Sequence, residues 1–368
     1  MSTVGSKVAI AVGVLLGVLL VGTWVFRLPC PKSPDTTVTA GSAQRGSGGA
    51  SPAAVSANEV AGVAGPSAAE ARAAIDRAVR WLRSIEIDPV AGGIEGFRYY
   101  VLEVRSWHVL YLYEADRARK EEYRKALQAR LAPLGDGSRL SGILETNKAP
   151  KFIAELLVAL VIARDAGHDL PAIEKRLPDL LRAGIEVPAR PVPLQIALAG
   201  LIESIGLKQG ATTPELRSRG MLQTRPKESK TGVMEAYLLT HEIFGLCDYG
   251  MRPLELAPDE RAWLERTLPF WALFYRLARR TDIGSEILIC NQVVGTSNTY
   301  EYGEGLTYLL ECQSPDGYFT EPAQGEAAAG FRPADRIHLF QVGLQAVLAH
   351  EALAEGRGPL AATLKRGR

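Results

Sequence analysis

Two histidines and two carboxylic acids stand in apolar, helical stretches of this sequence. His241 and Asp248 lie in one such stretch, Glu286 in a second and His338 in a third. Imidazole and carboxyl groups can exchange protons with a ligand when burial and neighbouring charges bring their pKa values near the working pH. The sequence therefore predicts His241, Asp248, Glu286 and His338 as candidate acid–base residues.

Helical spacing predicts that these side chains converge on one cavity. His241 and Asp248 share one side of a helix, opposite a stripe of apolar residues. Glu286 stands one turn after Asp282, and His338 begins a polar line along the last long helix. The other residues predicted to line the cavity are Glu155, Gly245, Asp282, Gln341 and Gln345.

Each of these residues also has a purely structural interpretation. Asp282 is near the expected start of a helix, where an aspartate commonly caps exposed amides. His241 could be hydrogen-bonded in the core or could face solvent. Glu286 stands among isoleucines and leucines, where a carboxylate is costly unless it is paired or reaches water. An ion pair with a neighbouring arginine or histidine would explain Glu286 equally well.

The sequence gives no support for a metal or a nucleotide cofactor. Cys247 and Asp248 point about 100° apart on a helix, and His241 and Asp248 are roughly 10 Å apart along its axis. Neither pair suits one metal ion. A Cys-x-x-Cys pair, a Gly-x-Ser-x-Gly elbow, a P-loop and a Gly-x-Gly-x-x-Gly motif are all missing. We expect no metal and no cofactor.

Composition excludes some partners. The 368 residues include 42 basic and 41 acidic side chains, which gives a formal charge of +1. This balance implies no global attraction to nucleic acid, so we expect no nucleic-acid partner. The four cysteines are too few and too irregularly spaced for a disulfide framework, and they do not indicate a compartment.

The N-terminal segment predicts a membrane anchor. After a short flank, 1–7, residues 8–26 are uncharged and apolar, close to the roughly 20 residues that a spanning helix needs. A cleaved signal peptide is the alternative, but its apolar region is usually roughly 7–15 residues long. Residues 27–66 are rich in Pro, Ser, Gly and Ala and predict a flexible linker. The short flank favours a single-pass protein whose remaining chain lies outside the cytoplasm.

The rest of the chain predicts an all-α domain over residues 67–356. Apolar residues recur at helical spacing almost without a break. The segment 152–162 is apolar nearly all round, whereas 116–130 is charged on one face. Buried helices that alternate with amphipathic ones predict an inner ring inside an outer ring, an α/α toroid of about twelve helices. We expect a loop between Gly135 and Pro150, and a basic C-terminal tail at 357–368.

One segment resembles the repeat of terpenoid cyclase and prenyltransferase toroids. A helix that ends in Leu-Leu-x-x-Gln313 is followed by Asp316-Gly317 and Phe319. The resemblance implies that the glutamine caps the helix and that the aromatic ring packs against a neighbour. The Asp-rich signature of terpene synthases, the acidic motif of squalene-type cyclases and the zinc motifs of toroid enzymes are missing. The resemblance therefore implies a fold and not an activity.

A wider resemblance covers residues 70–355. Glu155, Thr240-His241, Asp248-Tyr-Gly, Asp282-x-x-x-Glu286 and His338 follow one another in an order that is similar to uncharacterised bacterial toroid proteins. Such proteins often accompany biosynthetic genes. This resemblance implies the same fold and a shared central site without a known reaction.

The sequence leaves two functions open. The first is a membrane-anchored binding or scaffolding module for an unknown protein or small-molecule ligand, in which the polar inner residues are structural. The second is an enzyme that acts on a small molecule, glycan or peptide by His/carboxylate acid–base chemistry. The missing catalytic motifs favour the first.

Overall fold

Capping residues set where several helices begin and end in the computed structural model of this chain. Helix α2 (Ala68–Ser84) begins after Ser67, whose hydroxyl accepts from the Glu70 amide at 3.2 Å, while the Glu70 carboxylate accepts from the Ser67 amide at 2.7 Å. Helix α13 (Thr281–Val294) ends at Gly295, whose φ of 92° is in the left-handed region that glycine adopts without strain.

The structure describes residues 65–91, 93–147, 153–182, 190–207, 210–226, 232–322 and 333–366, all within the unit Val63–Arg368. The predicted anchor, 8–26, and almost all of the predicted linker, 27–66, lie outside the described residues. Among the helices that are described, none is long and apolar enough to cross a membrane.

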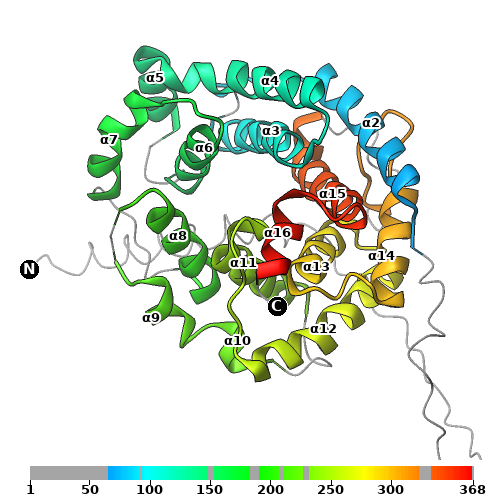
Figure 1. Cartoon of the computed structure of the whole chain (residues 1–368). Coiled ribbons are helices and arrows are strands. Elements are labelled where there is room, and N and C mark those ends of the chain that lie inside the picture. Colours follow the sequence, from blue (N-terminus) through cyan, green and yellow to red (C-terminus); the bar gives the residue numbers. More distant parts are fainter. Residues whose placement is uncertain are drawn as a thin grey trace, which may run out of the picture. The chain divides into compact units, whose positions relative to one another are not determined.

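An inner set of helices surrounds the centre of this unit (Figure 1). Each inner helix packs against the next one along the chain, and α15 returns to pack against α3. The set consists of α3 (Gly93–Tyr113), α6 (Ile153–Asp165), α8 (Val192–Ser204), α11 (Val233–Cys247), α13, and α15 (Pro333–Ala354).

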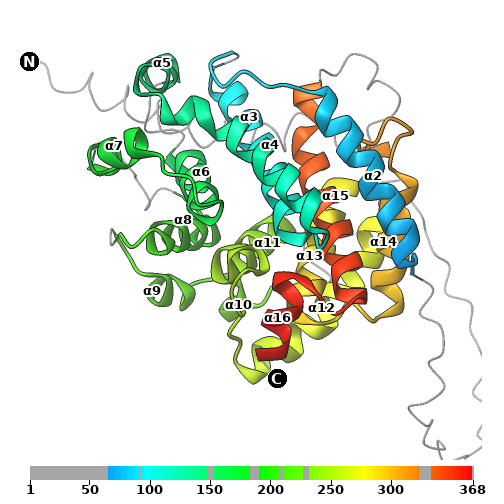
Figure 2. The same cartoon turned by 45° about the horizontal axis from the view of Figure 1, so that its top comes forward.

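An outer set of helices covers the inner one (Figures 1 and 2). It consists of α2, α4 (Arg117–Gly135), α5 (Gly137–Asn147), α7 (Pro171–Arg182), α9 (Thr213–Arg217), α10 (Met221–Thr224), α12 (Pro258–Leu277) and α14 (Tyr300–Glu311). In the described ranges the only β-structure is an isolated bridge between Gln313 and Phe319. The prediction of an all-α fold is confirmed.

The hydrophobic core lies between the inner and outer helices. Trp81 of α2 packs on Phe340 of α15 with ring centroids 4.3 Å apart, and Trp271 and Tyr275 of α12 are at most 2% exposed. Burying one large apolar side chain contributes about 1.5–3 kcal/mol. The core therefore fixes which side of each inner helix is left to face the centre.

Two segments differ from the sequence prediction. The expected loop between Gly135 and Pro150 contains helix α5, because the Asp136 carboxylate accepts from the Ser138 amide at 2.9 Å and caps a new helix. The expected tail contains α16 (Gly358–Arg366), in which Leu360 is only 2% exposed. Helix α16 packs against α15, α3 and the turn after α11.

The segment from Gln313 to Phe319 joins the end of α14 to two other helices. Gln313 Nε2 donates to the Ala74 carbonyl of α2 at 2.9 Å and to the Gly317 carbonyl of its own turn at 3.0 Å, so this side chain joins the end of α14 to α2. Phe319 is 2% exposed, and its ring centroid lies 6.4 Å from that of Phe340 on α15. The aromatic ring thus packs against a neighbouring helix.

Candidate functional site

Three inner helices bring five polar side chains together. Tyr237 and His241 come from α11, Asp282 and Glu286 from α13, and His338 from α15. Glu286 lies between the two histidines, with Oε2 3.7 Å from His241 Nδ1 and Oε1 3.8 Å from His338 Nε2. His338 Nε2 is also 3.7 Å from Asp282 Oδ1. We call these five residues the His–Glu cluster.

Burial controls the protonation of Glu286. The residue is 1% exposed. Burial raises the pKa of its carboxyl group to about 7; Asp282 acts in the same direction, and His338 and the Thr240 hydroxyl oppose the shift. Glu286 therefore gains or loses a proton near neutral pH.

The Thr240 hydroxyl can accommodate both protonation states of Glu286. Its oxygen is 2.9 Å from the Tyr237 carbonyl oxygen and 2.5 Å from Glu286 Oε2. One hydroxyl proton serves only one of these acceptors. When Glu286 is neutral, it can donate to Thr240 while Thr240 donates to the carbonyl; when Glu286 is ionised, Thr240 can donate to it.

His241 is held as a neutral ring with one nitrogen turned away from the backbone. Its Nδ1 lies 2.8 Å from the Tyr237 carbonyl oxygen, which can only accept, so the proton is assigned to Nδ1. Burial lowers the pKa of His241, and the Arg105 charge adds to this effect. The side chain nevertheless keeps 32% of its surface exposed. Its unprotonated Nε2 can therefore act as a base.

Asp282 faces the cluster and does not cap its helix. The Tyr237 hydroxyl donates to Asp282 Oδ2, while the Asp282 amide donates to Glu321 Oε2 at 2.9 Å. Glu321 thus does the capping. Asp282 Oδ1 is buried and has no hydrogen-bond partner among the described residues, and His338 Nε2 lies 3.7 Å from it.

Asp248 lies in a different place from its predicted partners. Helix α11 ends at Cys247, and Asp248 and Tyr249 have φ values of 47° and 53°. This left-handed turn breaks the helical spacing that placed Asp248 beside His241. Asp248 instead lines a pocket of about 440 Å³, counted with the open solvent inside its rim, which we call the Tyr249 pocket. Its lining includes Arg105, His108, Asp165, Tyr249 and Gln345.

The predicted glutamines are buried and hydrogen-bonded. Gln341 Nε2 donates to Gln345 Oε1 at 3.0 Å, and Gln345 Nε2 lies 3.4 Å from the Tyr249 carbonyl oxygen. Both side chains are at most 2% exposed. Gln345 lines the Tyr249 pocket, and the pair connects α15 to the turn that carries Tyr249.

Gly245 and Glu155 have different neighbours from those predicted. Gly245 is buried against α8, and a Cβ there would be 2.5 Å from the Ala197 Cα, so it serves close helix packing and does not line the cavity. Glu155 pairs with Arg98, Oε1 to Nε, at 3.3 Å. No contact between described residues joins Glu155 to the His–Glu cluster.

Sequence reasoning missed three residues at these sites. Tyr237 stands one turn before His241, so helical spacing could have found it. Arg105 interrupts the apolar face of α3, and this indicates a functional residue less clearly than the helical spacing of Tyr237 does. Tyr249 owes its place to a left-handed backbone that its residue type does not predict.

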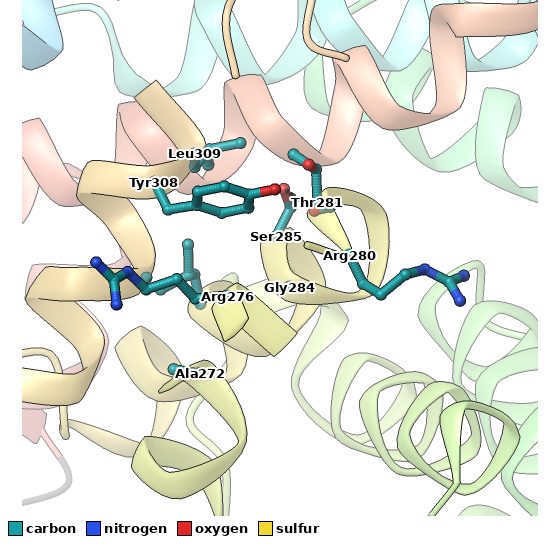
Figure 3. Close-up of a pocket in the computed structure, with 10 residues that line it drawn as sticks. Ala272, Arg276, Arg280, Thr281, Gly284, Ser285, Tyr308 and Leu309 are labelled. Carbon is teal, nitrogen blue, oxygen red and sulfur yellow. Dashed lines mark hydrogen bonds between the residues drawn. The ribbon is translucent and has the colours of Figure 1, made fainter. Parts of the chain in front are cut away.

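A second pocket lies on the other side of α13, between α12 and α14. Figure 3 shows Tyr308 reaching towards Thr281 and Ser285 while Arg276 and Arg280 point away from each other. Arg276 pairs with Glu304 and Arg280 with Glu321, each at 2.8 Å. Because both cations already have partners, this pocket of about 230 Å³ is the weaker candidate. Among the described residues, no group of three or more His, Cys, Asp or Glu side chains is placed to hold a metal ion.

Residues 107–341 match the family described as a domain of unknown function, DUF6895. The match spans more than half of the chain, so the protein belongs to this family. It includes the whole His–Glu cluster and Asp248. Neither a curated protein nor a solved structure was found to match the chain.

Proposed function

We propose that this domain is an enzyme that moves protons to and from a ligand held between its inner helices. The proposal rests on one observation: a carboxyl group 1% exposed lies between two histidines that are each about one third exposed, at 32% and 34%. A pKa of about 7 at Glu286 suits an acid or base that works near neutral pH.

Four side chains of the cluster have distinct roles in this proposal. His241 accepts a proton at Nε2, because its Nδ1 proton is engaged by the Tyr237 carbonyl. Glu286 in its neutral form supplies a proton through His338, whose Nε2 faces both Glu286 and Asp282. Asp282 Oδ1, 3.7 Å from His338 Nε2, is placed to accept from a proton carried on that nitrogen. The substrate is a small molecule, or the end of a glycan or peptide.

Comparative metabolite profiling tests the proposal. The full chain, a Glu286→Gln variant and a His241→Asn variant are incubated with a mixed metabolite extract, and mass spectrometry follows which compounds disappear. We expect wild type to convert at least one compound, and both variants to lose about 100-fold or more of that rate. Glu265→Gln, on the exposed side of α12, serves as the control. Equal conversion by wild type and Glu286→Gln would rule the proposal out.

A binding module without turnover is the second candidate. The favouring observation is that several inner polar groups bond to one another, as in the Gln341–Gln345–Tyr249 series. In that case the same profiling would detect compounds that bind to the wild-type protein and are not chemically converted.

We also propose the finer fold class and the membrane location. Inner helices that pack in succession, with α15 returning to α3, support an α/α toroid similar in fold to terpenoid cyclases. The apolar segment 8–26 supports a single-pass anchor with the helical domain outside the cytoplasm. Carbonate extraction of membranes, followed by protease treatment of intact cells, would test both the anchor and its orientation. Release of the chain by carbonate would argue against the anchor.

A further inference from the structure

Arg105 is one of the residues that line the Tyr249 pocket. Its guanidinium carbon lies 3.3 Å from the centroid of the Tyr249 ring. Within the described part of the chain Arg105 forms no ion pair, whereas Arg98, two turns earlier on α3, pairs with Glu155. Arg105 is therefore oriented by an aromatic face and keeps its hydrogen-bond donors for something else.

The aromatic platform under Arg105 is built and held in place. Tyr249 has a left-handed backbone, which a bulky residue adopts only when its surroundings enforce it, and Asp248 before it ends α11 in the same conformation. The Tyr249 ring stacks on Phe244 with centroids 4.4 Å apart, and Gln345 reaches its carbonyl oxygen. Strained backbone of this kind is common at ligand sites.

Neither of the two carboxylates that line the pocket, Asp165 and Asp248, forms an ion pair with Arg105. Asp165 Oδ2 is 3.3 Å from His108 Nε2, and the Asp165 side chain is 43% exposed, so water screens its charge. Burial raises the pKa of Asp248, and the charges of Arg252 and Arg105 oppose that shift. The remaining wall is apolar and includes Val109, Val158, Leu201 and Met251.

Arg105 also lies close enough to the His–Glu cluster to affect it. Burial lowers the pKa of His241, and the Arg105 charge lowers it further. Burial raises the pKa of Glu286, and the Arg105 charge opposes that shift. One cation thus serves the pocket and the cluster.

We propose that the Tyr249 pocket binds an organic anion with an apolar body, its carboxylate or phosphate on Arg105 and its chain against the aliphatic wall. This inference deepens the proposed function, and it rests on that function in taking the bound anion as the substrate of the His–Glu cluster. Binding and turnover are nevertheless measured separately.

Titration with a matched series of probes tests the anion site. The full chain is placed in lipid nanodiscs and titrated with hexanoate, hexyl phosphate, hexanamide and hexylamine by calorimetry, with empty nanodiscs as the blank. We expect one of the two anions to bind at least about tenfold more tightly than hexanamide, because a charge-assisted hydrogen bond is lost in the amide. The better anion identifies a carboxylate or a phosphate ligand.

Variants test whether the anion binds at Arg105. Arg105→Gln is expected to weaken anion binding about tenfold or more, Arg105→Lys to weaken it less, and Arg98→Gln to leave it unchanged. Thermal melting checks that each variant folds. Equal binding of anions and hexanamide, or undiminished anion binding by folded Arg105→Gln or Arg105→Lys, would overturn the inference. His241→Asn is expected to keep anion binding, so a loss of turnover there concerns only the proposed function.

Discussion

The buried carboxylates described in this chain differ in the groups that form ion pairs or hydrogen bonds with them. Glu103 pairs with Arg130, Glu260 pairs with Arg217, and Glu242 accepts from the amides of two successive residues at the start of α10. Arginine and backbone amides are permanent donors, so these carboxylates stabilise helix ends and contacts between helices. Glu286 has a hydroxyl and two histidines instead, all of which can change their hydrogen-bonding role. That difference separates Glu286 from the structural carboxylates.

The protonation of Glu286 predicts a pH-dependent stability. Its folded-state pKa of about 7 exceeds the 4.5 of an unfolded chain. The contribution of protonated Glu286 to the free energy of unfolding is fully present below pH 4.5 and is lost as the pH rises through 7. Over that range wild type should lose up to about 3 kcal/mol relative to Glu286→Gln, which carries no titrating group there. Urea unfolding at pH 5 and pH 8 measures this, with Glu265→Gln as control. If wild type and Glu286→Gln differ in unfolding free energy by the same amount at pH 5 and pH 8, the prediction is wrong.

The Tyr237 hydroxyl is predicted to stabilise the fold through Asp282. Tyr237→Phe removes the donor to Asp282 Oδ2 and leaves both carboxylate oxygens without a hydrogen bond among the described residues. We expect a loss of about 1–2 kcal/mol in the free energy of unfolding. Tyr275→Phe is the matched control, because that hydroxyl makes only a 3.4 Å contact to a carbonyl. Equal losses in the two variants would show that Asp282 does not depend on Tyr237.

At the scale of helices, the position of His241 depends on how closely α11 approaches α8. A Cβ on Gly245 would lie 2.5 Å from the Ala197 Cα, and that neighbour is backbone that cannot rotate away. We expect Gly245→Ala to destabilise the fold by about 1–3 kcal/mol and to move α11 relative to α13. Gly142→Ala on α5, where no atom lies within 4 Å, should be neutral or stabilise by up to about 1 kcal/mol. Urea unfolding of both variants compares the two sites, and a neutral Gly245→Ala would contradict the prediction.

Much of the helical pattern could be predicted from sequence, because apolar periodicity and capping residues determine it locally. The i,i+4 spacing correctly related Asp282 to Glu286 as neighbours on α13. The same argument failed for Asp248, because α11 ends one residue earlier in a left-handed turn. It failed for Gly245 because helical spacing gives the side of α11 on which a residue lies but not which neighbouring helix packs against that side. Contacts between distant helices, such as Arg105 on Tyr249, are tertiary and leave no local pattern.

At the scale of the whole described unit, the last helices join the first. Arg72 of α2 pairs with Glu114 at 3.0 Å and with Glu351 of α15 at 3.5 Å. Arg357 pairs with Glu351 and donates to the Tyr113 carbonyl at the end of α3. Polar links therefore accompany the apolar contact between α15 and α3. The position of the C-terminal helix, α16, is consequently fixed relative to the inner set.

Helix α16 is predicted to support the Tyr249 pocket. A Cβ on Gly250 would meet Leu360 at 3.2 Å, and the Thr363 hydroxyl lies 3.3 Å from the Gly250 carbonyl oxygen. Ending the chain after Arg357 removes these contacts and the burial of Leu360, worth roughly 3 kcal/mol. Hydrogen exchange should then become faster at residues 248–250, and anion binding should weaken, while exchange in α6 stays as it was. Ending the chain after Arg366 is the control and should change neither quantity. Unaltered exchange at residues 248–250 in the shorter chain would mean that the left-handed turn is held by α11 and Gln345 alone.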